Sequence, residues 1–174
     1  MAASIAVFVR ELALSFGHPQ VGTVGAITLH PNLINVVPGR VIMTVDLRNT
    51  DEMILQRAEH ELEAYCQALA TVEGVTITSR VLARFEPVTF DSRMVDLVAS
   101  TAAKHGHSVL RMPSGAGHDA QMMARVCPTA MIFTQSHLGI SHNPAEYTSD
   151  GDLEAGANVL LSMMVQLASG KALP

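Results

Sequence analysis

Residues 21–29, VGTVGAITL, decide the fold of the first half of this chain. The stretch is rich in β-branched residues and glycine and is typical of a β-strand. Pro31-Asn32 then turns the chain, and Pro38-Gly39 precedes a second strand that is predicted from about Val41 to Leu47. The sequence therefore predicts two consecutive strands joined by a short loop.

Helical patterns flank these two strands. Before them, apolar residues recur at helical spacing and Gly17 ends the pattern: Ile5, Phe8, Val9, Leu12 and Phe16. After them, Asn49 and Glu52 are spaced like an N-cap and its N3 partner. They open a helix with one apolar face: Ile54, Ala58, Leu62, Tyr65 and Leu69.

Alternation from Val75 to about Ala83 predicts a third strand after Gly74. Residues 1–86 thus read α-β-β-α-β, which resembles an α+β split βαβ, or ferredoxin-like, sandwich. One strand is missing, because the usual pattern would place a strand before the first helix.

The second half predicts a different class of structure after a boundary at Glu86-Pro87. Asp91 caps a helix closed by Gly106, with Met94, Val95, Val98 and Ala102 on its apolar face. A strand near 108–111, a short helix over 118–125 and a buried parallel strand over 129–134 follow. Ser149 and Asp152 cap a final helix with Leu153, Ala157, Leu160, Met164 and Leu167 on one face. This order, α-β-α-β-α, predicts one side of an α/β domain.

Composition excludes several classes of function. The 174 residues carry a net charge of −5 with no long basic run, which argues against binding to nucleic acid or to an anionic membrane. No apolar run is long enough to span a membrane, and the N-terminus lacks the features of a signal peptide. Cys66 and Cys127 are predicted to be buried free thiols in a reducing compartment. We therefore expect a soluble, cytoplasmic protein.

Asn35 and Arg48 are the first candidate binding residues. They bracket the second predicted strand and could converge at one end of the sheet. Arginine offers a planar fork suited to a carboxylate, and asparagine adds a neutral donor. The alternative is a surface ion pair between Asp46 and Arg48, with Asn35 in a turn.

The segment Ser114-Gly115-Ala116-Gly117-His118-Asp119 is the second candidate. Its glycines allow tight backbone geometry at a strand-to-helix turn, where unpaired N–H groups can bind an anion. Asp119 could orient the imidazole of His118. The alternatives are a glycine-rich turn without a ligand and a histidine that bonds the start of a helix.

The loop 139–146, GISHNPAE, is the third candidate. Neutral imidazole is a natural ligand for a divalent cation, so His142 could bind a metal, and Glu146 could support it or cap a helix. His137 lies nearby. A metal site needs three or four ligands, however, and the helical i, i+4 histidine pairs of zinc sites do not occur here.

Five short stretches in register resemble the M20 metallopeptidase-like amidohydrolases, in their hydantoinase/carbamoylase branch. This branch includes N-carbamoyl-L-amino-acid hydrolases and allantoate amidohydrolases. The stretches cover almost the whole chain: 21–25, 31–39, 46–48, 114–120 and 139–146.

The resemblance implies an enzyme that hydrolyses linear amides with a dinuclear zinc or manganese site. It implies that residues 1–86 form a lid and dimerisation domain. Residues 87–174 would form the C-terminal portion of a catalytic domain of the α/β zinc-aminopeptidase type.

The resemblance also implies roles for single residues. His142 would be a metal ligand, while Asn35, Arg48, Gly115 and Ala116 would bind a small-molecule substrate with a carboxylate. His118, Asp119 and Glu146 would lie just behind these contacts.

The remaining family motifs, including the glutamate pair that acts as general base, do not occur in this sequence. The chain is therefore predicted to be a C-terminal fragment or the product of a truncated gene, and inactive alone. Two alternatives remain open: another M20 metallopeptidase, and a non-catalytic ferredoxin-like module for dimerisation or small-molecule binding.

Overall fold

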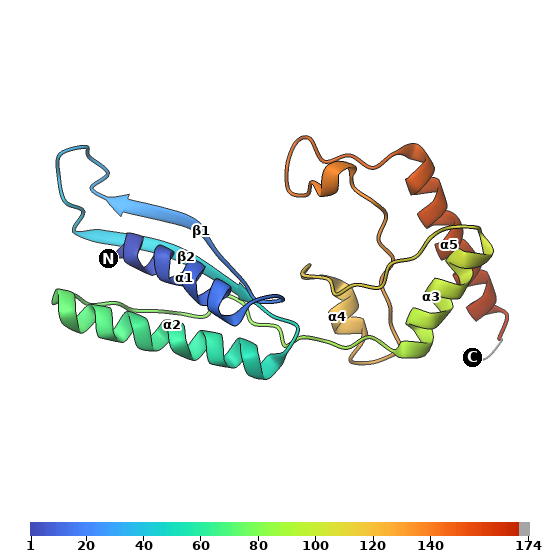
Figure 1. Ribbon diagram of the computed structural model, residues 1–174, viewed down its shortest axis with the longest axis horizontal. Helices are drawn as coiled ribbons and strands as arrows, with labels where there is room; N and C mark the ends of the chain where they lie inside the picture. The colour runs from blue at the N-terminus through green and yellow to red at the C-terminus, as the bar shows by residue number, and fades with distance from the viewer. Residues whose placement is uncertain (171–174) are drawn as a thin grey trace. The chain divides into compact units, whose positions relative to one another are not determined.

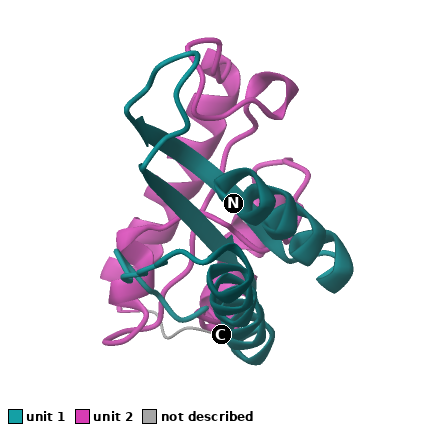
Figure 2. Ribbon diagram, turned by 90° about the vertical axis from the view of Figure 1, so that its left-hand side faces the viewer, with its two compact units in different colours: residues 1–87 teal, residues 88–174 magenta. Residues whose placement is uncertain are grey.

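A computed structural model describes residues 1–170 of the chain. The chain divides into two compact units, one of residues 1–87 and one that begins at Val88 (Figure 2). The first unit contains a two-stranded antiparallel sheet with helices packed against it. The described part of the second unit contains helices joined by irregular segments.

The sheet of the first unit is a hairpin of β1 (Val21–His30) and β2 (Arg40–Arg48), as the sequence predicts (Figure 1). Val21 lies opposite Arg48 at one end, and His30 lies opposite Arg40 at the other. The register shifts between Val24 and Ala26, so Gly25 is the extra residue of a β-bulge. The loop 31–39 therefore joins the strands at the end remote from Arg48.

Two helices pack against this hairpin and against each other. The first is α1 (Ala2–Phe16), which ends at Gly17 with φ 70°, and the second is α2 (Glu52–Glu73). The aromatic rings of Phe8 and Tyr65 stack between the helices with centroids 3.9 Å apart. The buried apolar residues of the two helices form the core of this unit: Ile5, Val9, Leu12, Leu55 and Ala58.

The predicted start of α2 is wrong by two residues. Asp51 is the N-cap, and its carboxylate accepts a hydrogen bond from the Ile54 N–H at 3.1 Å. Asn49 instead accepts from the Asp51 N–H and donates to Gln20, each at 2.9 Å. The predicted apolar face is largely confirmed, since Ala58 is buried and Leu62, Tyr65 and Leu69 are half-buried, but in the first turn Leu55 is buried and Ile54 is 37% exposed.

The third predicted strand, residues 75–83, is not a strand. Within residues 1–170, β1 and β2 pair only with each other. Alternating apolar residues can predict an extended chain, but a strand also requires a neighbour that shares its hydrogen bonds. Segment 75–83 has no such neighbour.

The second unit is organised by α3 (Ser92–Lys104) and α5 (Asp150–Ala168). The Asp91 carboxylate accepts from the N–H groups of Arg93 and Met94, which confirms the predicted cap of α3. The Ser149 hydroxyl caps α5, also as predicted, by accepting from the Asp152 N–H. Residues from the two helices form a small buried core: Leu97, Ala102, Val159 and Met163.

The predicted apolar face of α5 is wrong by one position. Val159 and Met163 are buried, whereas Leu160 and Met164 are 51% and 60% exposed. The helix is apolar on more than one side, and packing against α3 decides which side is buried. The backbone of α5 also approaches the side chain of Thr134 closely at Gly156. A Cβ on Gly156 would lie 2.5 Å from the Thr134 Cγ2, which further constrains how the helix packs.

Two other predictions for the second unit, and the predicted burial of both cysteines, need correction. Segments 108–111 and 129–134 form no strands, so the described residues of this unit contain no sheet. The helix predicted over 118–125 is shorter, α4 (Asp119–Met123), and a 3₁₀ turn, η1 (His137–Gly139), follows later. Cys127 is exposed and Cys66 is half-buried, so neither thiol is fully buried.

No helix in residues 1–170 is both long and apolar enough to cross a membrane.

Gly22 is the point of closest approach between α1 and β1, and its substitution tests the packing. A Cβ there would lie 3.0 Å from Val9 Cγ1 and 3.1 Å from the Val9 carbonyl oxygen. We predict that Gly22→Ala lowers the free energy of unfolding by about 1–3 kcal/mol in urea denaturation, the usual cost of overpacking. Gly25→Ala is the control, because its Cβ would meet only Thr44 Oγ1 at an ordinary 3.5 Å. Equal stability of the two variants would contradict the close contact.

Candidate functional site

Arg48 is engaged by a carboxylate of its own strand. Its Nε donates to Asp46 Oδ1 at 2.9 Å, and its Nη2 donates to Asp46 Oδ2 at 2.7 Å. The two side chains are half exposed, 51% for Arg48 and 49% for Asp46. The hydrogen bonds from Arg48 lower the pKa of Asp46 below its usual value, against a smaller opposing effect of desolvation. The surface pair that we held as an alternative thus exists, and it shows the guanidinium in the bidentate geometry that a carboxylate ligand requires.

Asn35 and Arg48 do not converge in one copy of the chain. Asn35 lies in loop 31–39, beyond Arg40, whereas Arg48 lies at the other end of β2 (Figure 1). The nine residues of β2 span roughly 26 Å at about 3.3 Å per residue. The expectation that both side chains meet at one end of the sheet is therefore wrong within a single copy.

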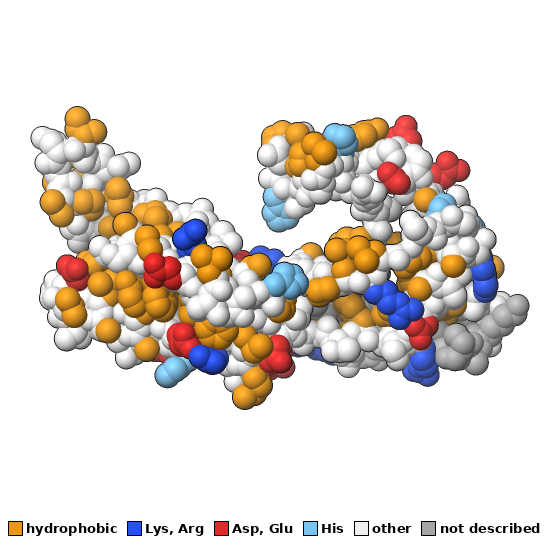
Figure 3. Space-filling model, viewed as in Figure 1, with side chains coloured by type: hydrophobic (Ala, Val, Ile, Leu, Met, Phe, Trp, Pro, Cys, Tyr) orange, Lys and Arg blue, Asp and Glu red, His pale blue; other side chains and the backbone are white. Residues whose placement is uncertain are grey.

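Loop 31–39 is apolar as well as exposed. Ile34 and Val37 are 106% and 89% exposed, and Leu33 is 60% exposed. Figure 3 shows the hydrophobic side chains at this end of the hairpin. Asn35 thus lies in a loop whose hydrophobic residues are left exposed by the described residues 1–170.

The glycine-rich turn holds His118 in a defined state. His118 is the N-cap of α4, and its Nδ1 accepts a hydrogen bond from the Ala120 N–H at 3.0 Å. A neutral imidazole that accepts at Nδ1 carries its proton on Nε2. His118 therefore presents a hydrogen-bond donor, and Asp119 lies in the first turn of the helix behind it.

Gly115 and Ala116 precede this histidine in an exposed segment. The Ala116 N–H donates to the hydroxyl of Ser114 at 3.1 Å. The turn is thus closed by a side chain of its own. A ligand that bound the Ala116 N–H would replace this bond with Ser114.

His142 lies in a loop closed by its own hydrogen bonds. The His137 N–H donates to the Tyr147 carbonyl at 2.7 Å and ties the two ends together. The Glu146 carboxylate accepts from the His142 N–H at 2.9 Å. His142 itself is exposed and has a positive φ of 55°. Sequence reasoning singled out both residues but gave no sign of the bond between them.

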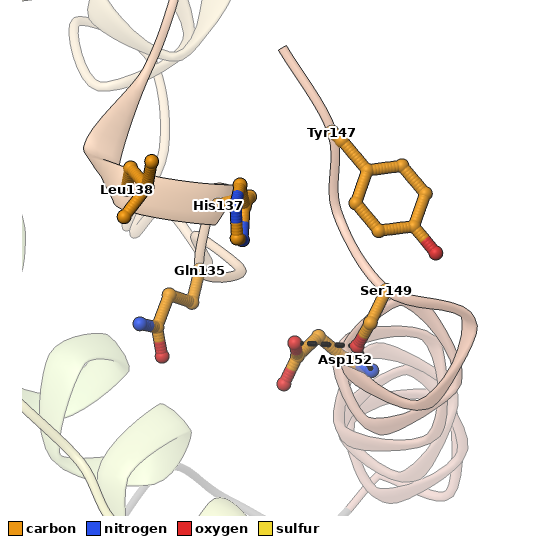
Figure 4. A pocket seen from close by; sticks show the side chains of 6 residues that line it. All are labelled: Gln135, His137, Leu138, Tyr147, Ser149 and Asp152. Carbon is orange, nitrogen blue, oxygen red and sulfur yellow. Dashed lines mark hydrogen bonds between the residues drawn. The ribbon is translucent and has the colours of Figure 1, made fainter. Parts of the chain in front are cut away.

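A shallow cavity of about 360 Å³ lies beside this loop, and Figure 4 shows its lining side chains. His142 is not among them. Sequence reasoning had kept His137 in view and had assigned Ser149 and Asp152 to a helix cap, but it missed the other side chains of the cavity. The lining residues are Gln135, His137, Leu138, Tyr147, Ser149 and Asp152.

The residues that the structure describes do not form a complete metal site. Within residues 1–170 no group of three or more histidine, cysteine, aspartate or glutamate side chains could hold a metal ion. His142 stands as one candidate ligand, and the carboxylate nearest to it in the loop, Glu146, is bound to backbone.

The hairpin with Arg48, the glycine-rich turn and the histidine loop all lie within the part of the chain that matches a known family. Residues 5–166 match the peptidase family M20/M25/M40, and the chain belongs to that family.

Two relatives and one solved structure show which members of the family this chain is similar to. The chain is 39% identical to an allantoate amidohydrolase of Escherichia coli (strain K12) over 158 residues, 91% of this chain. It is 38% identical to an N-carbamoyl-L-amino-acid amidohydrolase of Rhizobium meliloti over 166 residues, 95% of this chain. The crystal structure of a hydantoinase/carbamoylase family amidase from Burkholderia vietnamiensis superposes with a TM-score of 0.90 at 37% identity over 95% of this chain.

These comparisons confirm the resemblance to the hydantoinase/carbamoylase branch of the M20 amidohydrolases. The match covers only part of each relative. The chain spans 38% of the allantoate amidohydrolase and 40% of both the N-carbamoyl-L-amino-acid amidohydrolase and the amidase.

The pair of Asp46 and Arg48 predicts a dependence of stability on pH. Because the folded pKa of Asp46 is lowered, the pair stabilises the fold above the ordinary aspartate value of about 3.9 and loses its effect as pH falls through the lower, folded value. We predict that Asp46→Asn costs at most about 1 kcal/mol at pH 7, since the pair is half exposed, and that this cost shrinks as the pH falls through the folded pKa of Asp46. Urea denaturation at several pH values between 2 and 7 measures this. Arg48→Gln should likewise weaken the dependence of the unfolding free energy on pH in this range. If both variants keep the pH dependence of the wild type, the assigned ion pair is contradicted.

Proposed function

We propose that this chain is part of a metal-dependent amidohydrolase that cleaves C–N bonds of N-carbamoyl amino acids or of allantoate-like ureido acids. The observation that carries the proposal is the order and local structure of three elements in one chain of this family. They are the hairpin with Asn35 and Arg48, the turn at Gly115 and Ala116, and the closed loop around His142. The relatives named as amidohydrolases match over more than nine tenths of the chain, so all three elements lie in the shared region.

Each element has a proposed task that fits its geometry. Arg48 is already held flat and bidentate by Asp46, so its guanidinium is oriented for a substrate carboxylate. Gly115 and Ala116 would contact a substrate through their backbone groups in an exposed segment. His142 would be one ligand of a zinc or manganese pair that polarises the amide. His118 and Asp119 would support the turn, and Glu146 the loop.

The chain by itself should be inactive under this proposal. A catalytic zinc site uses three protein ligands and an open position, whereas residues 1–170 contain no group of three candidate ligands and His142 is the ligand position proposed here. We therefore expect the purified 174-residue chain to hydrolyse neither N-carbamoyl amino acids nor allantoate with added zinc or manganese.

A chimera tests the proposed activity. The matched segment of the E. coli allantoate amidohydrolase is replaced by this chain, and hydrolysis is measured with zinc or manganese. We predict metal-dependent cleavage of an N-carbamoyl amino acid or allantoate, and a loss of at least about 100-fold in kcat for His142→Ala, the usual effect of disturbing a metal site. His60→Ala, on the exposed side of α2, is the control and should keep the activity. Cleavage of dipeptides but not of ureido acids would instead favour a peptidase.

The same proposal requires a homodimer, because Asn35 and Arg48 lie at opposite ends of one hairpin. A single small substrate cannot touch both residues of one copy across roughly 26 Å. A two-fold axis across the hairpin would bring Asn35 of one copy to Arg48 of another, in two equivalent sites. The uncovered apolar residues of loop 31–39 suit such a contact.

Mixed variants test this arrangement in the chimera. Asn35→Ala and Arg48→Ala should each be inactive, since each damages both sites of its own dimer. When the two variants are unfolded and refolded together, half the dimers are mixed and each has one intact site, so about a quarter of the activity should return. No recovery, with dimers shown by light scattering, would mean that both residues act within one copy.

A further inference from the structure

The backbone of His142 adopts an uncommon conformation. Its φ is 55°, in the left-handed region that is uncommon for residues other than glycine. Histidine enters this region more readily than bulky residues do, but a neighbouring group must still select it. Such outliers concentrate at functional sites, where the surrounding structure holds them in place.

The Glu146 carboxylate is the group that holds this conformation. Its Oε2 accepts a hydrogen bond from the His142 N–H at 2.9 Å. A bond from a backbone N–H to an ionised carboxylate is stronger than one between neutral groups. The carboxylate therefore fixes the direction of the peptide plane immediately before the imidazole.

Glu146 is itself fixed in place by the turn between the two residues. Its N–H donates to the Asn143 carbonyl at 2.9 Å, and the Asn143 Oδ1 accepts from the Ala145 N–H at 2.9 Å. These bonds close residues 142–146 into a compact turn, so the glutamate side chain reaches back over a short and defined path.

The rest of the loop is closed without Glu146. The His137 N–H donates to the Tyr147 carbonyl at 2.7 Å, and the Ser136 hydroxyl donates to the Ile140 carbonyl. Loss of the Glu146 carboxylate would thus release the His142 N–H while the other hydrogen bonds of the loop remain.

We propose that Glu146 is a positioning residue for His142: its carboxylate holds the His142 N–H and so fixes the backbone from which the imidazole projects. Only the metal-binding role of the His142 imidazole rests on the proposed function. The orientation itself is a property of this chain and needs no metal.

The test measures amide hydrogen exchange and imidazole contacts by NMR in the 174-residue chain without metal. Glu146→Ala should speed exchange of the His142 N–H by about tenfold or more, as expected when a protecting hydrogen bond is lost. It should also scatter the contacts of the His142 ring protons over several conformers. Exchange of the His137 N–H, at the base of the loop, should stay unchanged.

Two further variants separate positioning from a general loss of structure. Glu146→Gln keeps an oxygen that can accept, so its exchange rate should fall between wild type and Glu146→Ala, with the ring contacts preserved. Glu154→Ala removes an exposed carboxylate from α5 and should change neither readout.

Unchanged exchange and ring contacts in Glu146→Ala would overturn the proposal. So would faster exchange at His142 with unchanged ring contacts, because the carboxylate would then hold the backbone without orienting the side chain. Since no metal is present, these outcomes are independent of the chimera assay. Glu146→Ala could change both exchange and ring contacts while the His142→Ala chimera stays fully active. That result would reject the metal-ligand role of His142 and keep the positioning role of Glu146.

Discussion

The pairing of β1 with β2 is the interaction on which the rest of the first unit depends. Its register places Val21 opposite Arg48 and His30 opposite Arg40. The same register brings Gly22 against Val9, so α1 can pack closely on the hairpin. Because the register of a strand pair sets both the face and the end at which a side chain lies, one set of backbone hydrogen bonds determines the core contact and the positions of the proposed ligand residues.

Several carboxylates of this chain are used to build its own structure. Asp46 binds Arg48, Asp91 binds the first N–H groups of α3, and Glu146 binds the N–H of His142. Each of these carboxylates thus has a structural task among the described residues. This agrees with the lack of any metal-binding group of three side chains in residues 1–170. Under the proposed function, the carboxylates here orient other groups, and the remaining ligands come from polypeptide that this chain does not contain.

The sequence predicted features that depend on neighbours along the chain and failed on features that depend on neighbours in space. The hairpin, the end of α1 at Gly17 and the cap at Asp91 are local, and all three are confirmed. The cap of α2 was misplaced because Asn49 and Asp51 are both good acceptors, and only the contact of Asn49 with Gln20 decides between them. The segments 75–83, 108–111 and 129–134 carry strand-like patterns, but a pattern cannot supply a partner strand.

In the candidate site, too, the sequence identified individual residues, whereas the contacts between them depend on the folded structure. Residue types and family motifs singled out Asn35, Arg48, His118, His142 and Glu146, whereas their relations were not visible. That Glu146 binds the backbone of His142 required the structure, which also selected, for His118, the alternative of a histidine that bonds the start of a helix. The separation of Asn35 from Arg48 followed from the hairpin register. Bending cannot close that distance, because the hairpin would first have to lose its ladder of hydrogen bonds. Under the proposed function, a site that uses both residues would therefore be completed by a second copy of the chain, since a conformational change within one copy would not bring them together.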